Sequence, residues 1–317
     1  AEDGIRDIGV TGVQTCALPI YAEIFVHLVD EASIGGCAER LQSRLGVNFV
    51  EVDSRKMLAE LEETFPGLTR TYSELSPTAH SARSNIIRYC VLWIHGGIYL
   101  DFDTFPLRSF DEVCAFEAFV GMEHVWVGDE MRVRGDRRFL LRPSTWHWAL
   151  SWLVRRADSL LLSGRLGLST ILGRSDASWQ FLQANNAVMG ATRGSEFVAE
   201  LLKALPGCSR GVRYATGPLL VDRIARENAD CVRVLDREVL YSIAPGESFR
   251  LFEDVTLDAH PRALLFHYVA SNHPALSELT IQELVSAGRN GTIAQRLLRS
   301  AIADIAEVSD LNCRVSA

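Results

Sequence analysis

Two aspartates, Asp101 and Asp103, stand at the end of an otherwise apolar stretch, HGGIYLDFDT (residues 95–104). Because side chains alternate along a strand, Tyr99 and both aspartates are expected on one face of it. Two carboxylates so close together raise each other's pKa unless a cation lies between them. A hard divalent ion bound through oxygen atoms relieves that repulsion. The spacing therefore predicts a metal site at the carboxyl end of this strand, with a solvated strand end as the plainer alternative.

The helix predicted before this strand, within PTAHSARSNIIRYCVLWIHGG, carries further candidates. Pro77 suits a first helical turn, apolar residues recur at helical spacing, and Gly96 and Gly97 end the helix. Asn85 and Arg88 are three residues apart and therefore share a face. Because Arg88 lies among apolar neighbours, it is predicted either to reach the surface along its stem or to be buried with an anionic partner.

A strand, a helix and a second strand are predicted near the beginning of the chain. EIFVHLVDE (23–31) and VNFVEVD (47–53) have the apolar, β-branched composition of strands, and CAERLQSRL (37–45) has the pattern of a helix. This order predicts parallel strands in an α/β fold. Asp30 and Asp53 end the two strands, where ligands collect in such sheets, but helix N-capping is the simpler explanation of both.

The later elements follow from apolar periodicity and turn residues. We expect paired strands over 115–127, a helix over 147–162, a short strand and a helix within 179–205, a turn and a helix over 215–227, one or two short strands within 231–245, a strand ending in a polar loop over 263–274, and a helical tail.

Several residues on these later elements are secondary site candidates, namely Asn185, Asn186, Gly217, His267 and Ser271. Each has a structural alternative. The asparagines can cap a turn or a strand end, and Gly217 can belong to a simple turn. A histidine on an apolar strand, such as His267, is more often a hydrogen-bonded core residue than a ligand.

The composition limits the classes of partner. The chain has 317 residues, of which 48% are hydrophobic and 23% charged, as in ordinary soluble globular proteins. Its formal net charge of −8, without any basic block, argues against a nucleic-acid partner. No run of about 18 apolar residues occurs, so no transmembrane segment is predicted. The seven cysteines lack CxxC spacing and are interpreted as free thiols in a reducing compartment, which argues against a zinc site.

Residues 1–20 fit no expected element. Within them, VTGVQTCALPI back-translates in frame to a common sequencing-library adapter. We therefore interpret residues 1–20 as an artefact, with an unusual natural start as the alternative, and exclude them from the fold. On this interpretation the protein begins at Tyr21, its native start with any targeting signal is missing, and EIFVHLVDE is the second strand of the natural sheet.

The motifs resemble a known family. SNIIRY followed by HGGIYLDFDT is similar to the DXD segment of sugar-nucleotide-dependent glycosyltransferases, among them bacterial capsular and lipopolysaccharide sugar transferases, fungal mannosyltransferases and glucosylating toxins. The match is specific over residues 79–107 and weaker downstream. The resemblance implies an α/β fold of the GT-A type, with a Rossmann-like, mainly parallel mixed sheet and helices on both faces. It implies a glycosyltransferase domain over 21–275 and a helical C-terminal segment over 276–317.

The resemblance also implies roles for individual residues. The metal ligands would be Asp103, Asp101 and His267, holding Mn²⁺ or Mg²⁺ and through it the donor diphosphate. Arg88 would reach donor sugar or phosphate oxygens. The other donor-binding residues would be Asn85, Tyr99, Asp101, Gly97 and Ser84, with Asn185, Asn186, Gly217 and Ser271 nearer the acceptor or donor side. Many relatives have aspartate at the position of Asn85, so the usual donor sugar is in question.

The function implied is metal-dependent transfer of a hexose from a nucleotide sugar, a UDP-hexose by this resemblance, to a glycan or lipid-linked acceptor in polysaccharide biosynthesis. Retention at the anomeric carbon is expected, without a carboxylate assigned as covalent nucleophile. A non-catalytic nucleotide-sugar binding module and a toxin-like protein glycosyltransferase are the alternatives. A cytoplasmic location, at the inner face of the membrane, fits such substrates.

Overall fold

The computed structural model describes residues 10–14, 24–29, 47–101, 103–125, 181–209, 214–243 and 261–267, together with scattered positions between 141 and 154. The helix predicted over 37–45 and the C-terminal helical segment lie outside these residues. The helix predicted over 147–162 lies largely outside them.

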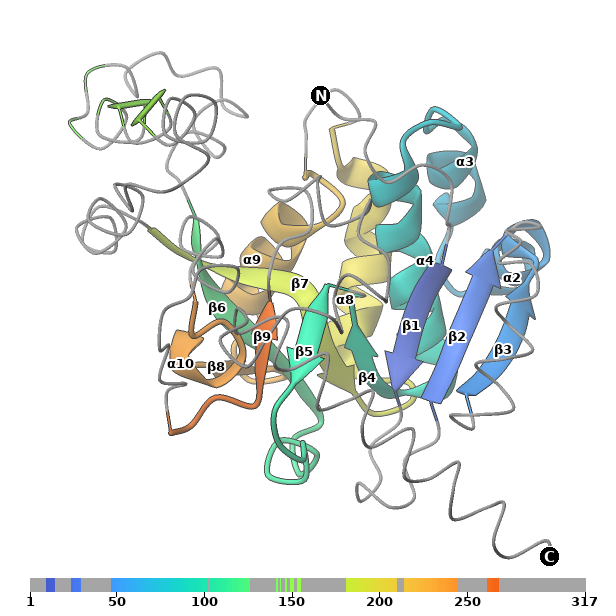
Figure 1. The fold of residues 1–317 in the computed structure, drawn as a ribbon. Helices are drawn as coiled ribbons and strands as arrows, with labels where there is room; N and C mark the ends of the chain where they lie inside the picture. Colours follow the sequence, from blue (N-terminus) through green and yellow to red (C-terminus); the bar gives the residue numbers. More distant parts are fainter. Residues whose placement is uncertain are drawn as a thin grey trace, which may run out of the picture.

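The strands of the described residues form a seven-stranded sheet, in the order β3-β2-β1-β4-β7-β6-β8, and a two-stranded sheet, β5-β9 (Figure 1). Their bounds are β1 (Val10–Gln14), β2 (Ile24–Val29), β3 (Val47–Val52), β4 (Gly97–Leu100), β5 (Thr104–Pro106), β6 (Ala118–Val125), β7 (Phe181–Ala191), β8 (Arg233–Leu235) and β9 (Leu265–His267).

The large sheet is mixed. β2 and β3 are parallel, as the strand–helix–strand order predicted, and β6 and β8 are parallel as well. All other neighbouring pairs in this sheet are antiparallel. The expectation of a mainly parallel sheet is therefore wrong. The reason lies in β7, which runs between β4 and β6 and opposite to both, whereas a parallel sheet requires crossover connections that return the chain to the same end.

β1 corrects the expectation that residues 1–20 take no part in the fold. Val10–Gln14 lies between β2 and β4 and pairs antiparallel with both. Two strands that each present unpaired backbone N–H and C=O groups to a common gap can accept an extended segment of almost any sequence. The pairing therefore shows how the segment is used in the fold, and it leaves the interpretation of its origin as a prediction.

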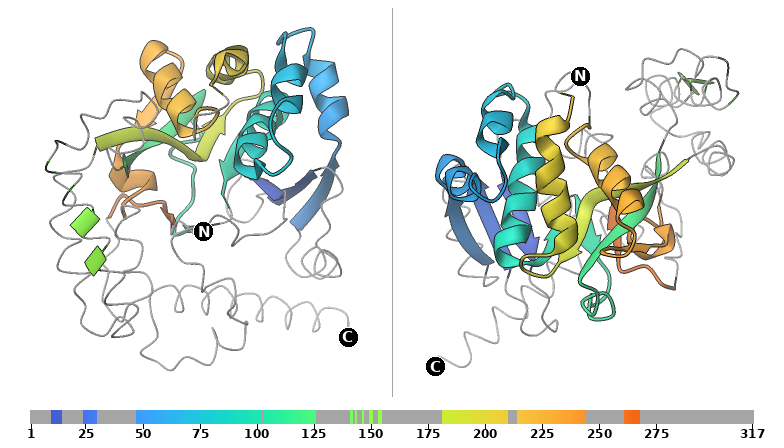
Figure 2. Two further views of the ribbon diagram at one scale, coloured as in Figure 1. Left: turned by 90° about the horizontal axis from the view of Figure 1, so that it is seen from above. Right: turned by 180° about the vertical axis from the view of Figure 1, so that it is seen from behind.

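Helices cover one face of the sheet (Figure 2). The long helices α4, α8 and α9 lie there, and α2 and α3 continue this layer beside α4. Their bounds are α2 (Ser54–Leu61), α3 (Leu68–Ser73), α4 (His80–His95), α8 (Glu196–Ala204), the 3₁₀ turn η3 (Leu205–Gly207) and α9 (Pro218–Glu227). The opposite face carries the short helix α10 (Arg237–Leu240) and the β5-β9 sheet. Helices on both faces were expected, but the long ones described lie on a single face.

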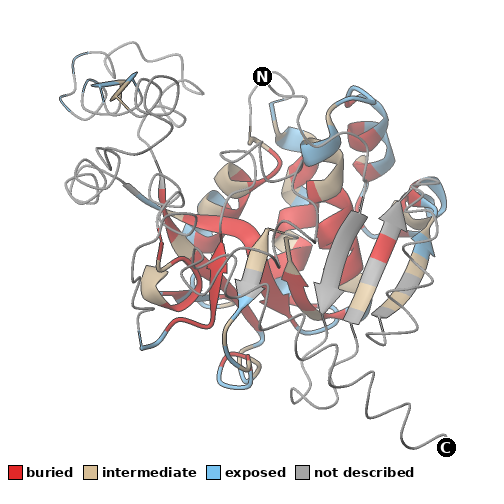
Figure 3. Cartoon of the chain, viewed as in Figure 1, coloured by how far each residue is buried: buried red, intermediate tan, exposed pale blue. Residues whose placement is uncertain are grey.

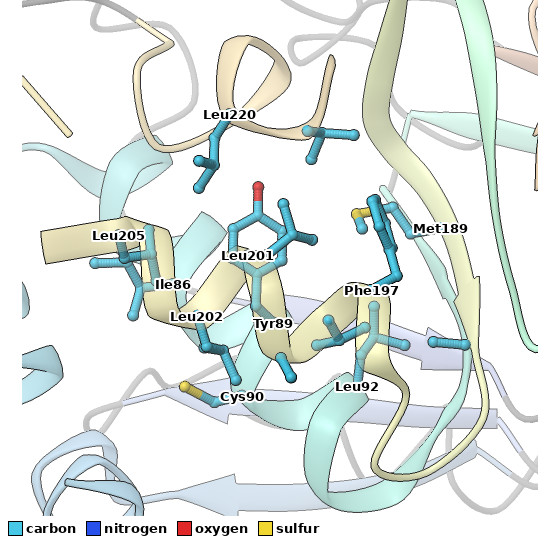
Figure 4. Packing of buried hydrophobic residues seen from close by; sticks show 14 of the residues in the cluster. Ile86, Tyr89, Cys90, Leu92, Met189, Phe197, Leu201, Leu202, Leu205 and Leu220 are labelled. Atoms are coloured by element: carbon cyan, nitrogen blue, oxygen red, sulfur yellow. The ribbon is translucent and has the colours of Figure 1, made fainter. Parts of the chain in front are cut away.

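Two apolar clusters lie on the two sides of the central strands of the sheet, where Figure 3 shows buried residues concentrated. The larger one packs α4, α8 and α9 together, with Ile86, Leu92, Phe197 and Leu201 almost completely buried (Figure 4). The smaller one joins β4, β6 and β7 to α10 and β9. Strand alternation divides neighbours between them: Tyr99 belongs to the first cluster, whereas Ile98 belongs to the second.

Two local expectations need correction. α4 begins at His80, so Pro77 precedes the helix instead of opening it, although Gly96 ends the helix as predicted. Residues 115–127 contain one strand, β6, whose partners β7 and β8 come from later in the chain. Within 231–245 the expectation of one or two short strands is confirmed by β8, which is followed by the helical turn α10.

The cysteines and the hydropathy of the helices were also predicted. Cys90, Cys208 and Cys231 are free thiols, as expected. Cys114 is disulfide-bonded, so the expectation of seven free thiols is wrong for this residue. None of the helices in the described parts of the chain combines the length and the hydrophobicity needed to cross a bilayer.

Candidate functional site

Asp101, Asp103 and His267 come together at the end of β4. Each offers one ligand atom, and these atoms all lie within 4.8 Å of one another. The β5-β9 pairing explains why, because Thr104 lies directly opposite His267 in that ladder and Asp103 immediately precedes Thr104. The Nε2 atom of His267 is 3.3 Å from an Asp103 carboxylate oxygen. A residue at the end of a late strand is thus delivered to the aspartates at the end of β4.

Arg88 binds Asp101, the first of these aspartates, through its guanidinium group. Its Nη2 atom lies 2.8 Å from Oδ1 of Asp101 and donates a second hydrogen bond of 2.9 Å to the Tyr99 hydroxyl. Its Nη1 atom donates to the backbone carbonyl of Asn186, and the guanidinium carbon lies 3.9 Å from the centre of the Tyr99 ring. Arg88 is therefore buried with an anionic partner, the second of the two arrangements that the sequence left open. That it also reaches donor oxygens stays a prediction.

Tyr99 has a supporting position. Its side chain is 2% exposed, and its hydroxyl donates a 2.6 Å hydrogen bond to Oδ1 of Asp101. The strand alternation correctly placed Tyr99 on the same face as Asp101, and the Tyr99 hydroxyl contacts that carboxylate directly. That Tyr99 also approaches the nucleotide or sugar stays a prediction.

The ionisable side chains of the site lie close together in a partly buried environment. Burial raises the pKa of Asp101 above its ordinary value, and the charge of Asp103 raises it further against the opposing effect of Arg88. Burial alone would lower the pKa of His267, but its contacts with Asp103 and a second carboxylate, Glu123, raise it to about 10. In the absence of a metal ion, a protonated His267 therefore supplies positive charge between the carboxylates.

Glu123 is a site residue that the sequence reasoning missed. It lies on β6, is 4% exposed, and its Oε1 atom is 3.1 Å from Nδ1 of His267. Its Oε2 atom accepts a hydrogen bond from the side-chain amide of Asn185. The signal available in the sequence was a carboxylate inside the apolar run AFVGMEHV, because a buried carboxylate requires partners.

The two asparagines lie at an irregularity of the sheet. The β6-β7 register shifts where Val120 pairs with Met189 but the next residue, Gly121, pairs with Asn185. The intervening part of β7 bulges out of this ladder, as often happens beside functional sites. The side chain of Asn185 forms a hydrogen bond within the bulge: its Oδ1 atom accepts from the backbone N–H of Ala187 at 2.9 Å.

The side chain of Asn186 contacts the helix layer. Its amide donates a 2.8 Å hydrogen bond to Oδ1 of Asn85 on α4. Gly217 completes this cluster, since a Cβ atom there would lie 2.6 Å from the Asn85 amide nitrogen. The structure thus gathers Asn85, Asn186 and Gly217 one layer away from the aspartates, and all three are buried or half-buried.

The other predicted site residues are less informative. Gly97 begins β4 with a φ of 104°, a conformation that favours glycine. Ser84 is half-buried on α4, next to Asn85 in sequence. Ser271 lies outside the described residues.

The arrangement fits a divalent cation. Two carboxylates and an imidazole nitrogen converge within 4.8 Å, all three groups are half-buried or buried, and burial raises the pKa of Asp101. Mn²⁺ and Mg²⁺ accept such oxygen ligands, and imidazole nitrogen is a ligand for the transition metal as well. The chemistry open to this site is therefore the binding and polarisation of an anionic group by a bound cation.

Residues 27–120 match the family model described as "glycosyltransferase sugar-binding region containing DXD motif". The match runs from β2 to the start of β6 and includes Asn85, Arg88, Asp101 and Asp103, but not Glu123 or His267. No curated protein matches the chain. The family indicates glycosyl transfer or sugar binding. Residues 27–120 are thus similar to the same DXD glycosyltransferase family that the motifs resembled.

Proposed function

We propose that this protein is a metal-dependent glycosyltransferase of the GT-A type, which moves a hexose from a nucleotide sugar to a glycan or lipid-linked acceptor. The observation that carries the proposal is the convergence of Asp101, Asp103 and His267 at the end of β4. It is supported by the family match, which covers both aspartates. The choice of UDP as the nucleotide rests on the motif resemblance alone.

In this proposal the cation is held by the two carboxylates and the imidazole Nε2 of His267. When bound, it neutralises the charge that grows on the nucleoside diphosphate as it departs. The chain's own residues fix the position of these ligands. Arg88 and Tyr99 both contact Oδ1 of Asp101, so its second carboxylate oxygen is the one that would be available to a cation.

We further propose that the reaction retains the anomeric configuration by a front-face attack of the acceptor hydroxyl. Glu123 is the buried carboxylate nearest the metal ligands among the residues described at the site. Both of its oxygens accept hydrogen bonds, from His267 and Asn185, and the side chain is 4% exposed. Such a carboxylate is not available as a covalent nucleophile, which supports a mechanism without a glycosyl-enzyme intermediate.

A donor screen with and without metal tests the function. The full chain would be incubated with common nucleotide sugars and Mn²⁺, and released nucleoside diphosphate would be measured. We expect turnover that EDTA abolishes and Mn²⁺ restores. Asp103→Asn should lower the rate by roughly 10²–10³-fold, since losing a metal contact costs several kcal/mol of transition-state stabilisation. Asp111→Asn, at an exposed position between β5 and β6, is the matched control and should keep the rate.

Equal rates with and without EDTA would contradict the proposal, and so would full activity of Asp103→Asn. Calorimetry separates the remaining alternative. Binding of UDP in the presence of Mn²⁺, without turnover of any donor, would instead identify a non-catalytic nucleotide-sugar binding module.

A further inference from the structure

A chain of hydrogen bonds leads from the backbone of β7 to the imidazole of His267. It begins with the backbone N–H of Ala187, which donates to Oδ1 of Asn185 at 2.9 Å. A backbone N–H can only donate, so this contact fixes the orientation of the Asn185 amide. The NH₂ group of Asn185 must then face the next member of the chain, Oε2 of Glu123.

Glu123 is the next member of this chain of hydrogen bonds and links Asn185 to His267. Its Oε2 atom is occupied by a donor from Asn185, and its Oε1 atom lies 3.1 Å from Nδ1 of His267. An ionised carboxylate only accepts, so Nδ1 of His267 must carry a proton. Glu123, Asn185 and His267 are all at least nine-tenths buried, so water does not compete freely for these contacts.

We propose that Glu123 is a positioning residue, which keeps the His267 proton on Nδ1 and so leaves Nε2 free to bind the cation between Asp101 and Asp103. The inference rests on the metal site of the proposed function. The Nε2 atom of His267 is the nitrogen that lies 3.3 Å from an Asp103 carboxylate oxygen. The rings of Tyr241 and His267 pack edge to face, with their centres 5.7 Å apart. The buried carboxylate on β6 thus determines which imidazole nitrogen is offered to the metal.

The substitution Glu123→Gln tests this polarity directly because it preserves shape but replaces one acceptor by a donor. If the new amide turns its NH₂ group to Asn185, two donors face each other, and the backbone of Ala187 prevents Asn185 from turning. If it turns its NH₂ group to His267, Nδ1 must accept and the proton moves to Nε2. An Nε2 that carries a proton cannot bind a metal ion.

The experiment measures metal binding and proton position with the metal alone. Mn²⁺ affinity of the full chain would be measured by electron paramagnetic resonance. Glu123→Gln is expected to weaken it by about 10–100-fold, the usual effect of losing an outer partner of a metal ligand. Glu112→Gln, at an exposed position, is the matched control and should retain the affinity.

The proton position is read by ¹⁵N NMR of the histidine side chains with saturating Zn²⁺, a diamagnetic ion that binds both carboxylate oxygen and imidazole nitrogen. The His267 signals would be assigned by their loss in His267→Gln. In the unaltered chain we expect the proton on Nδ1 alone, and in Glu123→Gln a shift of the proton toward Nε2. A purely structural role of Glu123 would not move this signal.

A second variant and a measurement on the unaltered chain keep the test decisive. Should Glu123→Gln fail to fold, Glu123→Ala offers neither donor nor acceptor to Nδ1, and we expect a loss of Mn²⁺ affinity of about 10-fold. The NMR measurement on the unaltered chain needs no variant at all. Wild-type Mn²⁺ affinity in Glu123→Gln, a proton on Nε2 in the Zn²⁺-bound chain, or no Mn²⁺ binding by the unaltered chain would each overturn the inference. Since no sugar donor is used, absence of glycosyl transfer would overturn only the proposed function.

Discussion

At the scale of single residues, the Arg88–Asp101 pair is the contact on which the site depends most. Arg88 is 4% exposed, and the negative charge of Asp101 keeps its pKa above the ordinary value although burial alone would lower it. Removing one partner of such a pair leaves an uncompensated charge, which typically costs 3–5 kcal/mol. Because the Asp101 side chain is 31% exposed, we expect Arg88→Met to lower the free energy of unfolding by about 3 kcal/mol, measured by urea denaturation.

The same measurement distinguishes a charge effect from a packing effect. Adding Asp101→Asn to Arg88→Met should recover part of the lost stability, because no unpaired carboxylate remains. Arg226→Met is the surface comparison, since Arg226 also forms an ion pair with an aspartate but is 67% exposed. It should change stability by at most about 1 kcal/mol. Similar losses for Arg88→Met and Arg226→Met would refute the importance of burial.

Residue-scale prediction succeeded where one local rule was sufficient. Strand alternation placed Tyr99 and Asp101 on one face, and the apolar neighbours of Arg88 included burial with an anion as one of two expected arrangements. It failed for Glu123, whose partner His267 is 144 residues away in the chain. An apolar strand with one carboxylate shows that a partner must exist, but nothing in the sequence says which residue the fold will bring to it.

At the scale of elements, the close approach of β6 and β7 beside the bulge depends on glycine. A Cβ atom on Gly190 would lie 2.0 Å from the Phe119 ring, which covers it. We therefore expect Gly190→Ala to destabilise the protein by about 1–3 kcal/mol through overpacking. The measurement is again the free energy of unfolding in urea.

The control for this prediction lies in the η3 turn. Nothing lies within 4 Å of a Cβ atom built on Gly207, so Gly207→Ala should stay within about 0.5 kcal/mol of the parent. Phe119→Leu removes the outer ring atoms that the new methyl group meets. Phe119→Leu should therefore lower the free energy of unfolding less in the Gly190→Ala background than in the unaltered protein. Strict additivity of the two changes would argue against a steric origin.

The elements themselves were largely predictable, but their pairing was not. The β2, β3, β4, β7 and β9 strands and the α4, α8 and α9 helices follow apolar periodicities and turn residues that act over a few positions. The β6-β7 bulge and the pairing of β5 with β9 depend on contacts between distant segments. Residues 115–127 illustrate the limit, because a long apolar run with a central glycine fits one strand as well as a hairpin.

At the scale of the whole molecule, continuity of the sheet passes through β1. Val10–Gln14 joins β2 and β3 to the site strands β4, β7 and β6. β2 and β4 run in the same direction and are both antiparallel to β1. Composition and motif could not have predicted this, since the adapter-like segment fits no expected element and backbone hydrogen bonding makes little demand on side chains.

Deletion of residues 1–20 tests whether β1 is needed. We expect the shortened chain to lose at least about 3 kcal/mol of stability, because the ladders of β2 and β4 lose a shared partner, and to associate through the exposed edges. Thermal unfolding and size-exclusion chromatography measure these two effects. Val13→Pro in the full chain should act in the same direction, since proline removes one donor from a central strand.

His27 on β2 provides a local readout of the same event. Burial, with the charge of His95 in addition, lowers its pKa from the ordinary 6.5 to about 4. Because the folded value lies below the unfolded one, His27 contributes stability that is complete above about pH 6.5 and lost as the pH falls toward 4. When β1 is removed and β2 is released, the pKa of His27 should return toward 6.5 in an NMR titration. An unchanged titration together with an unchanged unfolding temperature would show that the sheet does not need β1, and would favour the interpretation of residues 1–20 as an artefact.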